Sequence, residues 1–210
     1  MGAFIYISVF IFGTIVGSFL NVVILRHNTG RGVTGRSGCF SCGKTLSWYE
    51  LIPIFSFLTL RGKCGVCQSK ISWQYPLVEF ANGLLFVFLW AYFDVKTGDI
   101  FLLMQFIISC ILWSSLLVIF VYDLKHKIIP DRFSLLFAIC AVLLVLLGKF
   151  IVPGYSVFSH IIGASVLSGF FFILWYTSNG RWMGFGDVKL AFSIGPVSYT
   201  HLTLPTNREV

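Results

Sequence analysis

Charge is the property that this sequence has least of. Only 11% of its 210 residues are Asp, Glu, Lys or Arg, whereas a soluble domain of average composition carries about 25%. Residues 100–122 contain no charged side chain at all. The chain also lacks internal repeats and low-complexity tracts. In their place it has apolar residues, at 57% of the total, and this composition indicates a membrane protein.

The apolar residues are grouped into long runs. A membrane-spanning helix needs about 20 mostly apolar residues, and backbone groups in lipid must be satisfied within the segment, which favours helices. No basic residue precedes the first run and no small-residue cleavage site follows it, so we interpret it as a retained helix and not as a cleaved signal peptide. Five runs qualify as spans: residues 3–25, 77–93, 100–122, 133–152 and 157–176.

A sixth apolar run begins after Asp187 and stops at Pro196, which is too short to cross a hydrocarbon core about 30 Å thick. We therefore predict an all-α multi-pass membrane protein with five full transmembrane helices, a truncated sixth and a cytoplasmic zinc-binding loop between helices 1 and 2. The predicted divisions are helix 1 (1–25), the loop (26–75), a peptidase membrane core (76–195) and an anomalous tail that we do not expect to be native (196–210).

The basic residues alternate along the chain. The first, third and fifth loops carry twelve Lys and Arg residues, whereas the second and fourth carry two. By the positive-inside rule the odd loops are cytoplasmic and the N-terminus is outside. A nucleic-acid surface would cluster its basic residues without this alternation. We therefore expect membrane lipid and no nucleic acid as a partner.

Four of the six cysteines form two Cys-x-x-Cys pairs, and this pattern predicts a structural zinc site with four thiolate ligands. Gly43 and Gly65 are expected to allow the tight turns around the ion. Two disulfides are the alternative, which a reducing cytoplasm disfavours. Cys110 and Cys140 lie in apolar surroundings without a partner at metal spacing, so we interpret them as small buried hydrophobic residues. The expected zinc ligands are Cys39, Cys42, Cys64 and Cys67.

Two aspartates lie at ends of apolar spans. Asp123 closes the third helix and Asp187 opens the sixth, and the charge pattern places both on the cytoplasmic side. Charged groups at a membrane are costly and indicate function. Two close carboxylates do not easily both ionise, so one can take a proton from water while the other donates one to a scissile carbonyl. Gly184 and Gly186 would allow close packing beside Asp187. The alternative is that each aspartate is only a solvated helix-end charge.

Other polar residues are given structural interpretations. Asp131 is expected to cap the fourth helix, with a catalytic role as the alternative. Glu79, near the start of the second helix, is electrostatically favoured there; holding the cytoplasmic loop or the substrate is a second role for it. His126 is interpreted as a solvated residue beside Asp123, and His160 as a structural residue with its hydrogen bonds satisfied.

Five segments together resemble the type IV prepilin peptidases. They include the two cysteine pairs, and the resemblance extends from residue 1 to about residue 195. The other segments are 17–26 (GSFLNVVILR), 71–79 (ISWQYPLVE), 123–131 (DLKHKIIPD) and 184–189 (GFGDVK).

The resemblance implies an intramembrane aspartic protease of the Gly-x-Gly-Asp type in the bacterial inner membrane. It would cleave prepilins or pseudopilins at the cytoplasmic face, between a basic leader and an apolar helix, and it would serve type IV pili or type II secretion. Asp123 and Asp187 match the catalytic pair of the family. Members with the cysteine loop usually also methylate the new N-terminus with S-adenosylmethionine. No glycine fingerprint for that cofactor is present, so methyl transfer depends on the resemblance alone.

The residues alone also allow other functions. A different protease of the Gly-x-Gly-Asp type would not need the cysteine loop. A proton-coupled carrier would place its carboxylates near the membrane midplane, often on interrupted helices. A zinc-loop scaffold would need neither aspartate. The family also continues with further helices after its second aspartate, which this sequence does not contain.

Overall fold

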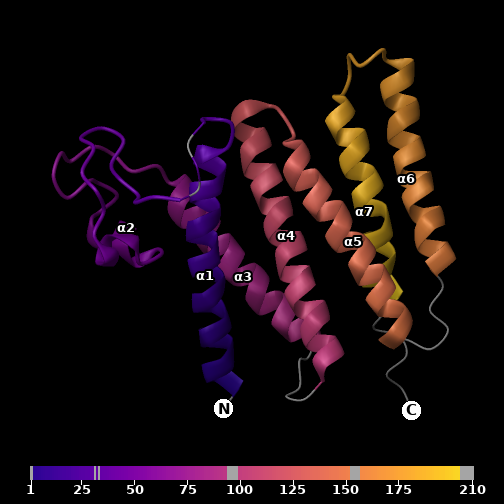
Figure 1. The fold of residues 1–210 in the computed structure, drawn as a ribbon, viewed down its shortest axis with the longest axis horizontal. Coiled ribbons are helices and arrows are strands. Elements are labelled where there is room, and N and C mark those ends of the chain that lie inside the picture. Colours follow the sequence, from indigo (N-terminus) through magenta and orange to yellow (C-terminus); the bar gives the residue numbers. More distant parts are fainter. Residues whose placement is uncertain (1, 31, 33, 94–98, 152–156, 204–210) are drawn as a thin grey trace. The chain divides into compact units, whose positions relative to one another are not determined.

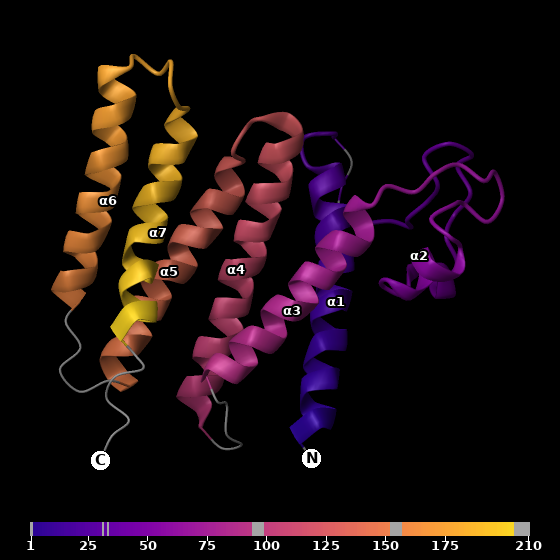
Figure 2. The same ribbon diagram turned by 180° about the vertical axis from the view of Figure 1, so that it is seen from behind.

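The computed structural model describes residues 2–30, 32, 34–93, 99–151 and 157–203. The chain folds as two units, residues 1–94 and 95–210, shown as a ribbon in Figures 1 and 2. In the described residues every named element of secondary structure is a helix. Five of these helices are long and apolar enough to cross a membrane, which confirms the five predicted spans.

The first unit is built on two long helices, α1 (Gly2–Arg26) and α3 (Gln74–Phe93). They pack closely because glycines line their contact. A Cβ added to Gly17 would lie only 2.8 Å from the Cα of Glu79, and one added to Gly13 would lie 2.9 Å from the Cα of Gly83. Asn82 of α3 is fully buried, and its Nδ2 donates a hydrogen bond to the Gly13 carbonyl at 2.7 Å. Small residues and interhelical hydrogen bonds are typical of helix association in membranes.

The segment between α1 and α3 has little regular structure. It contains a short 3-10 helix, η1 (Trp48–Leu51), and one short α-helix, α2 (Phe55–Thr59). Two isolated antiparallel β-bridges, Gly38 with Thr45 and Lys63 with Lys70, each close a small turn. Such a loop cannot bury a large core of its own, so it needs other ties to hold its shape.

The described part of the second unit contains four helices: α4 (Ile100–His126), α5 (Asp131–Ile151), α6 (Val157–Thr177) and α7 (Phe185–Thr203). Asp99 caps α4, because its Oδ1 accepts hydrogen bonds from the N–H groups of Phe101 and Leu102 at 3.1 and 3.2 Å. The helices alternate in direction, so the end of α4 and the start of α7 lie at the same end of this unit, the upper end in Figure 1. This arrangement matters because Asp123 and Asp187 lie in those two turns.

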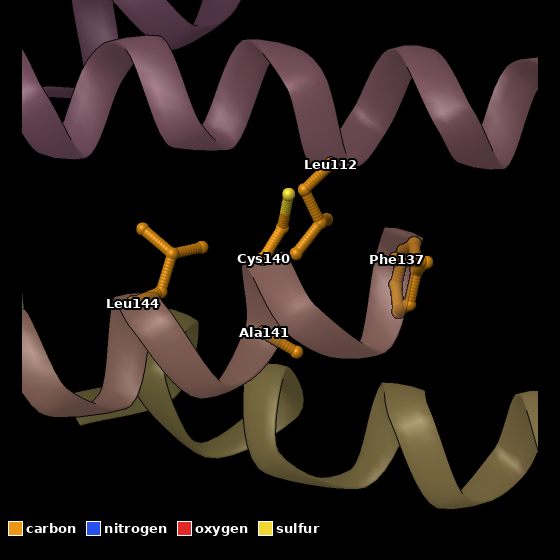
Figure 3. Packing of buried hydrophobic residues seen from close by; sticks show 5 residues of the cluster. All are labelled: Leu112, Phe137, Cys140, Ala141 and Leu144. Carbon is orange, nitrogen blue, oxygen red and sulfur yellow. The ribbon is translucent and has the colours of Figure 1, made fainter. Parts of the chain in front are cut away.

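The core of the second unit is formed mainly by α4 and α5. Figure 3 shows Cys140 of α5 directed toward Leu112 of α4, while Ala141 points toward α7. Phe137 and Leu144 complete the buried cluster. Cys140 is therefore a buried apolar residue, as predicted, and Cys110 is buried as well.

The last helix differs from the sequence expectation. The apolar run ends at Pro196, but α7 continues through this proline to Thr203 and has 19 residues. A proline inside a helix removes only its own N–H hydrogen bond and crowds the preceding turn; here the helix continues past it. α7 is not among the five helices that qualify as spans. Residues 204–210 of the expected tail lie outside the described residues.

Candidate active site and metal centre

The four paired cysteines meet in one cluster in the first unit. Their Sγ atoms all lie within 4.8 Å of one another, and the Sγ atoms of Cys39 and Cys67 are 3.7 Å apart. A tetrahedral zinc ion with Zn–S bonds of about 2.3 Å places its sulfur ligands about 3.8 Å from each other. None of the four forms a disulfide. The donor set and its spacing therefore fit one zinc ion.

Each cysteine pair lies on a tight turn of the same kind. The N–H of Gly43 donates to the Cys39 carbonyl at 3.0 Å, and the N–H of Gln68 donates to the Cys64 carbonyl at 3.1 Å. Both donor residues have left-handed backbones, with φ of +72° at Gly43 and +57° at Gln68. The expected role of Gly43 is confirmed. The expected role of Gly65 is wrong, because the left-handed residue of the second turn is the one after the pair, Gln68.

Ser69 forms hydrogen bonds with two of the four thiols, those of Cys39 and Cys67. Its Oγ lies 3.1 Å from the Sγ of Cys67 and 3.5 Å from the Sγ of Cys39. Together with the N–H groups of Cys42 and Ser41, it lowers the pKa of Cys39 to about 5. Ser69 also lowers the pKa of Cys67. Because the thiolate is the form that binds metal, these hydrogen bonds favour the charged ligands at neutral pH.

Glu50 links the two cysteine turns. Its side chain is buried, and its carboxylate accepts hydrogen bonds from Lys44 Nζ at 2.8 Å and from the Ser47 N–H at 2.9 Å. Lys44 and Ser47 hold the pKa of Glu50 below its usual range. A Cβ added to Gly65, in the second turn, would lie 3.5 Å from Glu50 Oε1. Glu50 was not among the residues predicted from the sequence, although Ser47, three residues before it, forms with it a capping-box pattern that indicates such a contact.

Glu79 also holds the loop. It lies in α3, is only 6% exposed, and its Oε2 accepts a hydrogen bond from the Ile54 N–H at 2.7 Å. Ile54 precedes α2 and has a φ of +60°, an unfavourable conformation for a β-branched residue. Of the two roles considered for Glu79, contact with the loop is therefore the one seen here.

Asp123 lies in the last turn of α4 and is partly exposed. The helix ends three residues later because Lys127 takes a left-handed conformation and its N–H bonds back to the Asp123 carbonyl at 2.7 Å. Among the described residues, none forms a hydrogen bond or an ion pair with the Asp123 carboxylate. The ring of His126 packs against that of Tyr122 in a tilted arrangement, with centroids 4.4 Å apart.

Asp187 is the third residue of α7 and is partly exposed. Its Oδ2 accepts a hydrogen bond from the Gly184 N–H at 3.1 Å, which is one half of a capping box. Asp187 thus has a structural role at the start of α7, and one of its oxygens stays outside that bond. A Cβ at Gly184 would meet no atom closer than 3.8 Å, whereas one at Gly186 would lie 3.1 Å from Ile129. Close packing is therefore found at Gly186 alone.

The first turn of α7 packs against the loop that follows α4. Besides the contact of Gly186 with Ile129, Lys189 Nζ lies 2.8 Å from Asp131 Oδ1. Asp131 was expected to cap α5. It is instead the first residue of α5, and the contact its carboxylate makes is with Lys189. Nothing in the sequence indicates this pair, because its members are 58 residues apart.

An open groove lies beside this end of the second unit. Its volume is about 720 Å³, and α5, α6 and α7 line it with mostly apolar side chains. Asp131 and Lys189 border the groove, and serines contribute to its lining, among them Ser134, Ser168 and Ser193.

His160 of α6 is buried, in agreement with a structural role.

Comparisons with known proteins agree with this architecture. The family model described as the bacterial peptidase A24 N-terminal domain matches residues 11–93, and that of the type IV leader peptidase family matches residues 110–206. The first match covers the cysteine loop, and the second contains both aspartates. No solved structure matches the chain.

Several curated proteins named prepilin leader peptidase/N-methyltransferase are similar to the chain. The protein from Vibrio cholerae is 32% identical over 211 residues, covering 91% of this chain and 77% of the relative. That from Bacillus subtilis is 34% identical over 187 residues, covering 89% and 71%. That from Myxococcus xanthus is 38% identical over 135 residues, covering 61% of this chain and 37% of the relative.

The helical architecture and the matches define a multi-pass membrane peptidase. The chain belongs to the prepilin leader peptidase family, the type IV leader peptidases.

Proposed function

We propose that this protein is an aspartic endopeptidase of the bacterial inner membrane that cleaves the basic leader from type IV prepilins or pseudopilins. The observation that carries the proposal is the placement of Asp123 and Asp187 at one end of the second unit, inside the segment matched by the type IV leader peptidase family. Each residue lies at a helix end and is partly exposed, so water and an extended peptide can reach it.

The two carboxylates act as a coupled acid–base pair. The ionised member takes a proton from a water molecule, and the oxygen of that water attacks the scissile carbonyl carbon. The neutral member donates its proton to the carbonyl oxygen. The tetrahedral intermediate then collapses: the aspartate that took the proton from water gives it to the leaving nitrogen as the C–N bond breaks, and the other aspartate takes a proton back from the diol. The leader is released with a new carboxyl group, and the pair regains its starting protonation. The hydrogen bond of Asp187 to Gly184 supports this role, because it fixes one carboxylate oxygen and leaves the other for chemistry.

The active site faces the cytoplasm in this proposal. The alternation of basic residues among the loops supports this, because the positive-inside rule favours an orientation with the end of α4 and the start of α7 inside and the N-terminus outside. A basic leader on a cytoplasmic segment would be attracted to a site that carries one negative charge, although Lys125 and Lys127 partly oppose this attraction. The apolar helix of the substrate would stay in the membrane.

The same protein is proposed to methylate the N-terminus that cleavage creates, as the names of its relatives indicate for those proteins. S-adenosylmethionine would supply the methyl group; no residues are assigned to it. Cys39, Cys42, Cys64 and Cys67 would hold a structural zinc ion. With four protein ligands the ion has no open position, so it would stabilise the loop and take no part in hydrolysis.

The test is cleavage of a recombinant prepilin by the full-length protein reconstituted in lipid vesicles, with mass spectrometry of both fragments. With S-adenosylmethionine added, we expect the wild type to release the leader and to add the mass of one methyl group to the new N-terminus. Asp123→Asn and Asp187→Asn should not cleave. An Asn at position 187 can still accept the Gly184 hydrogen bond, so α7 should form in that variant.

Asp99→Asn is the matched control, since Asp99 lies at the opposite end of α4 and an Asn can still cap that helix. This variant should cleave as the wild type does. Wild-type cleavage by both Asp123→Asn and Asp187→Asn would refute the aspartic mechanism.

A further inference from the structure

The ion pair between Asp131 and Lys189 joins the two segments that carry the proposed catalytic aspartates. Asp131 opens α5, eight residues after Asp123, and Lys189 lies two residues after Asp187. We propose that Asp131 and Lys189 are positioning residues, which set the separation of Asp123 and Asp187 by fixing the start of α7 against the α4–α5 loop. This inference rests on the proposed peptidase function.

The connection from Asp123 to Asp131 is short and well defined. Lys127 ends α4 through its hydrogen bond to the Asp123 carbonyl, and the Pro130 carbonyl accepts the N–H groups of Phe133 and Ser134 at the start of α5. Pro130 is buried, and its ring fixes its own φ. The short, hydrogen-bonded connection therefore fixes the position of Asp131 relative to the last turn of α4.

The connection on the α7 side is equally short. Lys189 Nζ lies 5.5 Å from the centre of the Phe185 ring, and the Phe185 ring packs on Trp175 of α6 with centroids 5.1 Å apart. Asp187 lies between Phe185 and Lys189 in the same turn, and its own side chain is tied to Gly184. The first turn of α7 is thus anchored to α6 through Phe185 and to α5 through Lys189.

The exposure of the pair separates a positioning role from a general stabilising one. The side chains of Lys189 and Asp131 are 47% and 79% exposed, and exposed ion pairs contribute little to folding stability. Removing the pair should therefore leave the helices folded. Catalysis is more sensitive than folding to small shifts between reacting groups, and the loss of a contact this exposed should lower the rate by a few-fold.

The pair also borders the groove between α5, α6 and α7, so direct contact with substrate is the competing role. The two roles differ in kinetics. Loss of a substrate contact made equally in the ground and transition states raises KM and leaves kcat unchanged, whereas loss of alignment lowers kcat.

The experiment measures kcat and KM for prepilin cleavage by the full-length protein, together with its unfolding temperature. Asp131→Asn and Lys189→Met should each lower kcat about three- to five-fold, with KM and the unfolding temperature unchanged. The double variant should lose no more than the worse single one, because the two side chains act as one unit. Lys189→Arg, which keeps the charge, should retain most of kcat.

Lys149→Met is the matched control, an exposed lysine in the last turn of α5, at the opposite end of that helix from Asp131, and it should behave as the wild type. Three outcomes would overturn the inference: wild-type kcat in both single variants, an effect on KM alone, or equal losses in Lys189→Arg and Lys189→Met. If Asp123→Asn and Asp187→Asn are inactive in the same assay, the proposed function stands regardless of these outcomes. If those two variants are fully active, the proposed function itself fails.

Discussion

Replacing one of the four cysteine ligands should lower the affinity of the loop for zinc. Cys64 is the most buried of the four ligands, and its backbone N–H is bonded to the Ser69 carbonyl at 2.9 Å. Cys64→Ser replaces a soft thiolate by a hydroxyl that binds zinc poorly, while the turn keeps its backbone hydrogen bonds. The substitution therefore removes one metal bond with little other change.

The magnitude follows from the geometry of the cluster. Its sulfur atoms lie within 4.8 Å of one another, so a zinc ion needs to draw each pair together by about 1 Å at most. Binding to a cluster arranged in this way should contribute the usual 10 to 16 kcal/mol or so of a structural site. An equal share for each of four ligands is about 3 kcal/mol, which corresponds to a loss of zinc affinity of about 100-fold.

The assay is competition with a chromogenic chelator, supported by metal analysis of the purified protein. The wild type should contain about one zinc ion per chain, and Cys64→Ser should lose its zinc to a chelator concentration that leaves the wild type loaded. Cys140→Ala, at a buried cysteine of α5 outside the cluster, should behave as the wild type. Equal zinc affinity in Cys64→Ser and the wild type, or no zinc in either, would refute the reasoning.

Three further predictions concern the first unit. Zinc binding at pH 7 should release fewer than four protons, measured by calorimetry in buffers of different ionisation enthalpy, because the pKa of Cys39 is lowered to about 5 whereas the thiol of Cys42, with a pKa raised to about 11, still carries its proton. Affinity for zinc should accordingly fall as the pH falls and thiolates are protonated. Glu79→Leu should destabilise the loop by about 1 to 3 kcal/mol, because the partly buried Ile54 N–H loses its acceptor, and limited proteolysis of the loop would measure this. Gly17→Leu should lower the unfolding temperature in detergent, because even a Cβ at this position meets the α3 backbone.

Each of these predictions has a control and a result that would contradict it. Release of all four protons would show that no thiolate is formed before the metal binds. Glu79→Gln keeps an acceptor for Ile54 and should protect the loop far better than Glu79→Leu does; equal protection in the two variants would remove the role of that hydrogen bond. Gly169→Ala, at a site where nothing lies within 4 Å of an added Cβ, should leave the unfolding temperature unchanged, and a similar fall in both glycine variants would contradict the packing argument.

The spans could be predicted from the sequence because each depends on a property of a continuous segment. The predicted and observed boundaries differ mainly where polar residues extend a helix. α3 begins at Gln74, before Pro76, since a proline is tolerated in a first helical turn. α4 continues past Tyr122 to His126, where the left-handed Lys127 ends it. Apolar length alone does not indicate these polar turns.

The cysteine cluster was also predictable, because Cys-x-x-Cys spacing is a local signal that two turns can present to one metal. The details were not. Gly65 was assigned a special backbone that Gln68 has instead, since the left-handed residue follows each pair whatever its type. The contacts of Glu79 with Ile54 and of Asp131 with Lys189 join residues 25 and 58 positions apart. Such contacts depend on how helices and loops pack, and sequence spacing alone does not reveal them.

The central claim is that Asp123 and Asp187 work as one acid–base couple, and a double-mutant cycle tests it most directly. The measurement is the single-turnover rate constant of prepilin cleavage for the wild type, Asp123→Asn, Asp187→Asn and the double variant. Because catalytic groups that act as a unit are strongly non-additive, each single variant should lose about 1,000-fold or more and the double variant no more than the worse single one. Independent losses that multiply in the double variant, or a wild-type rate in either single one, would contradict the account.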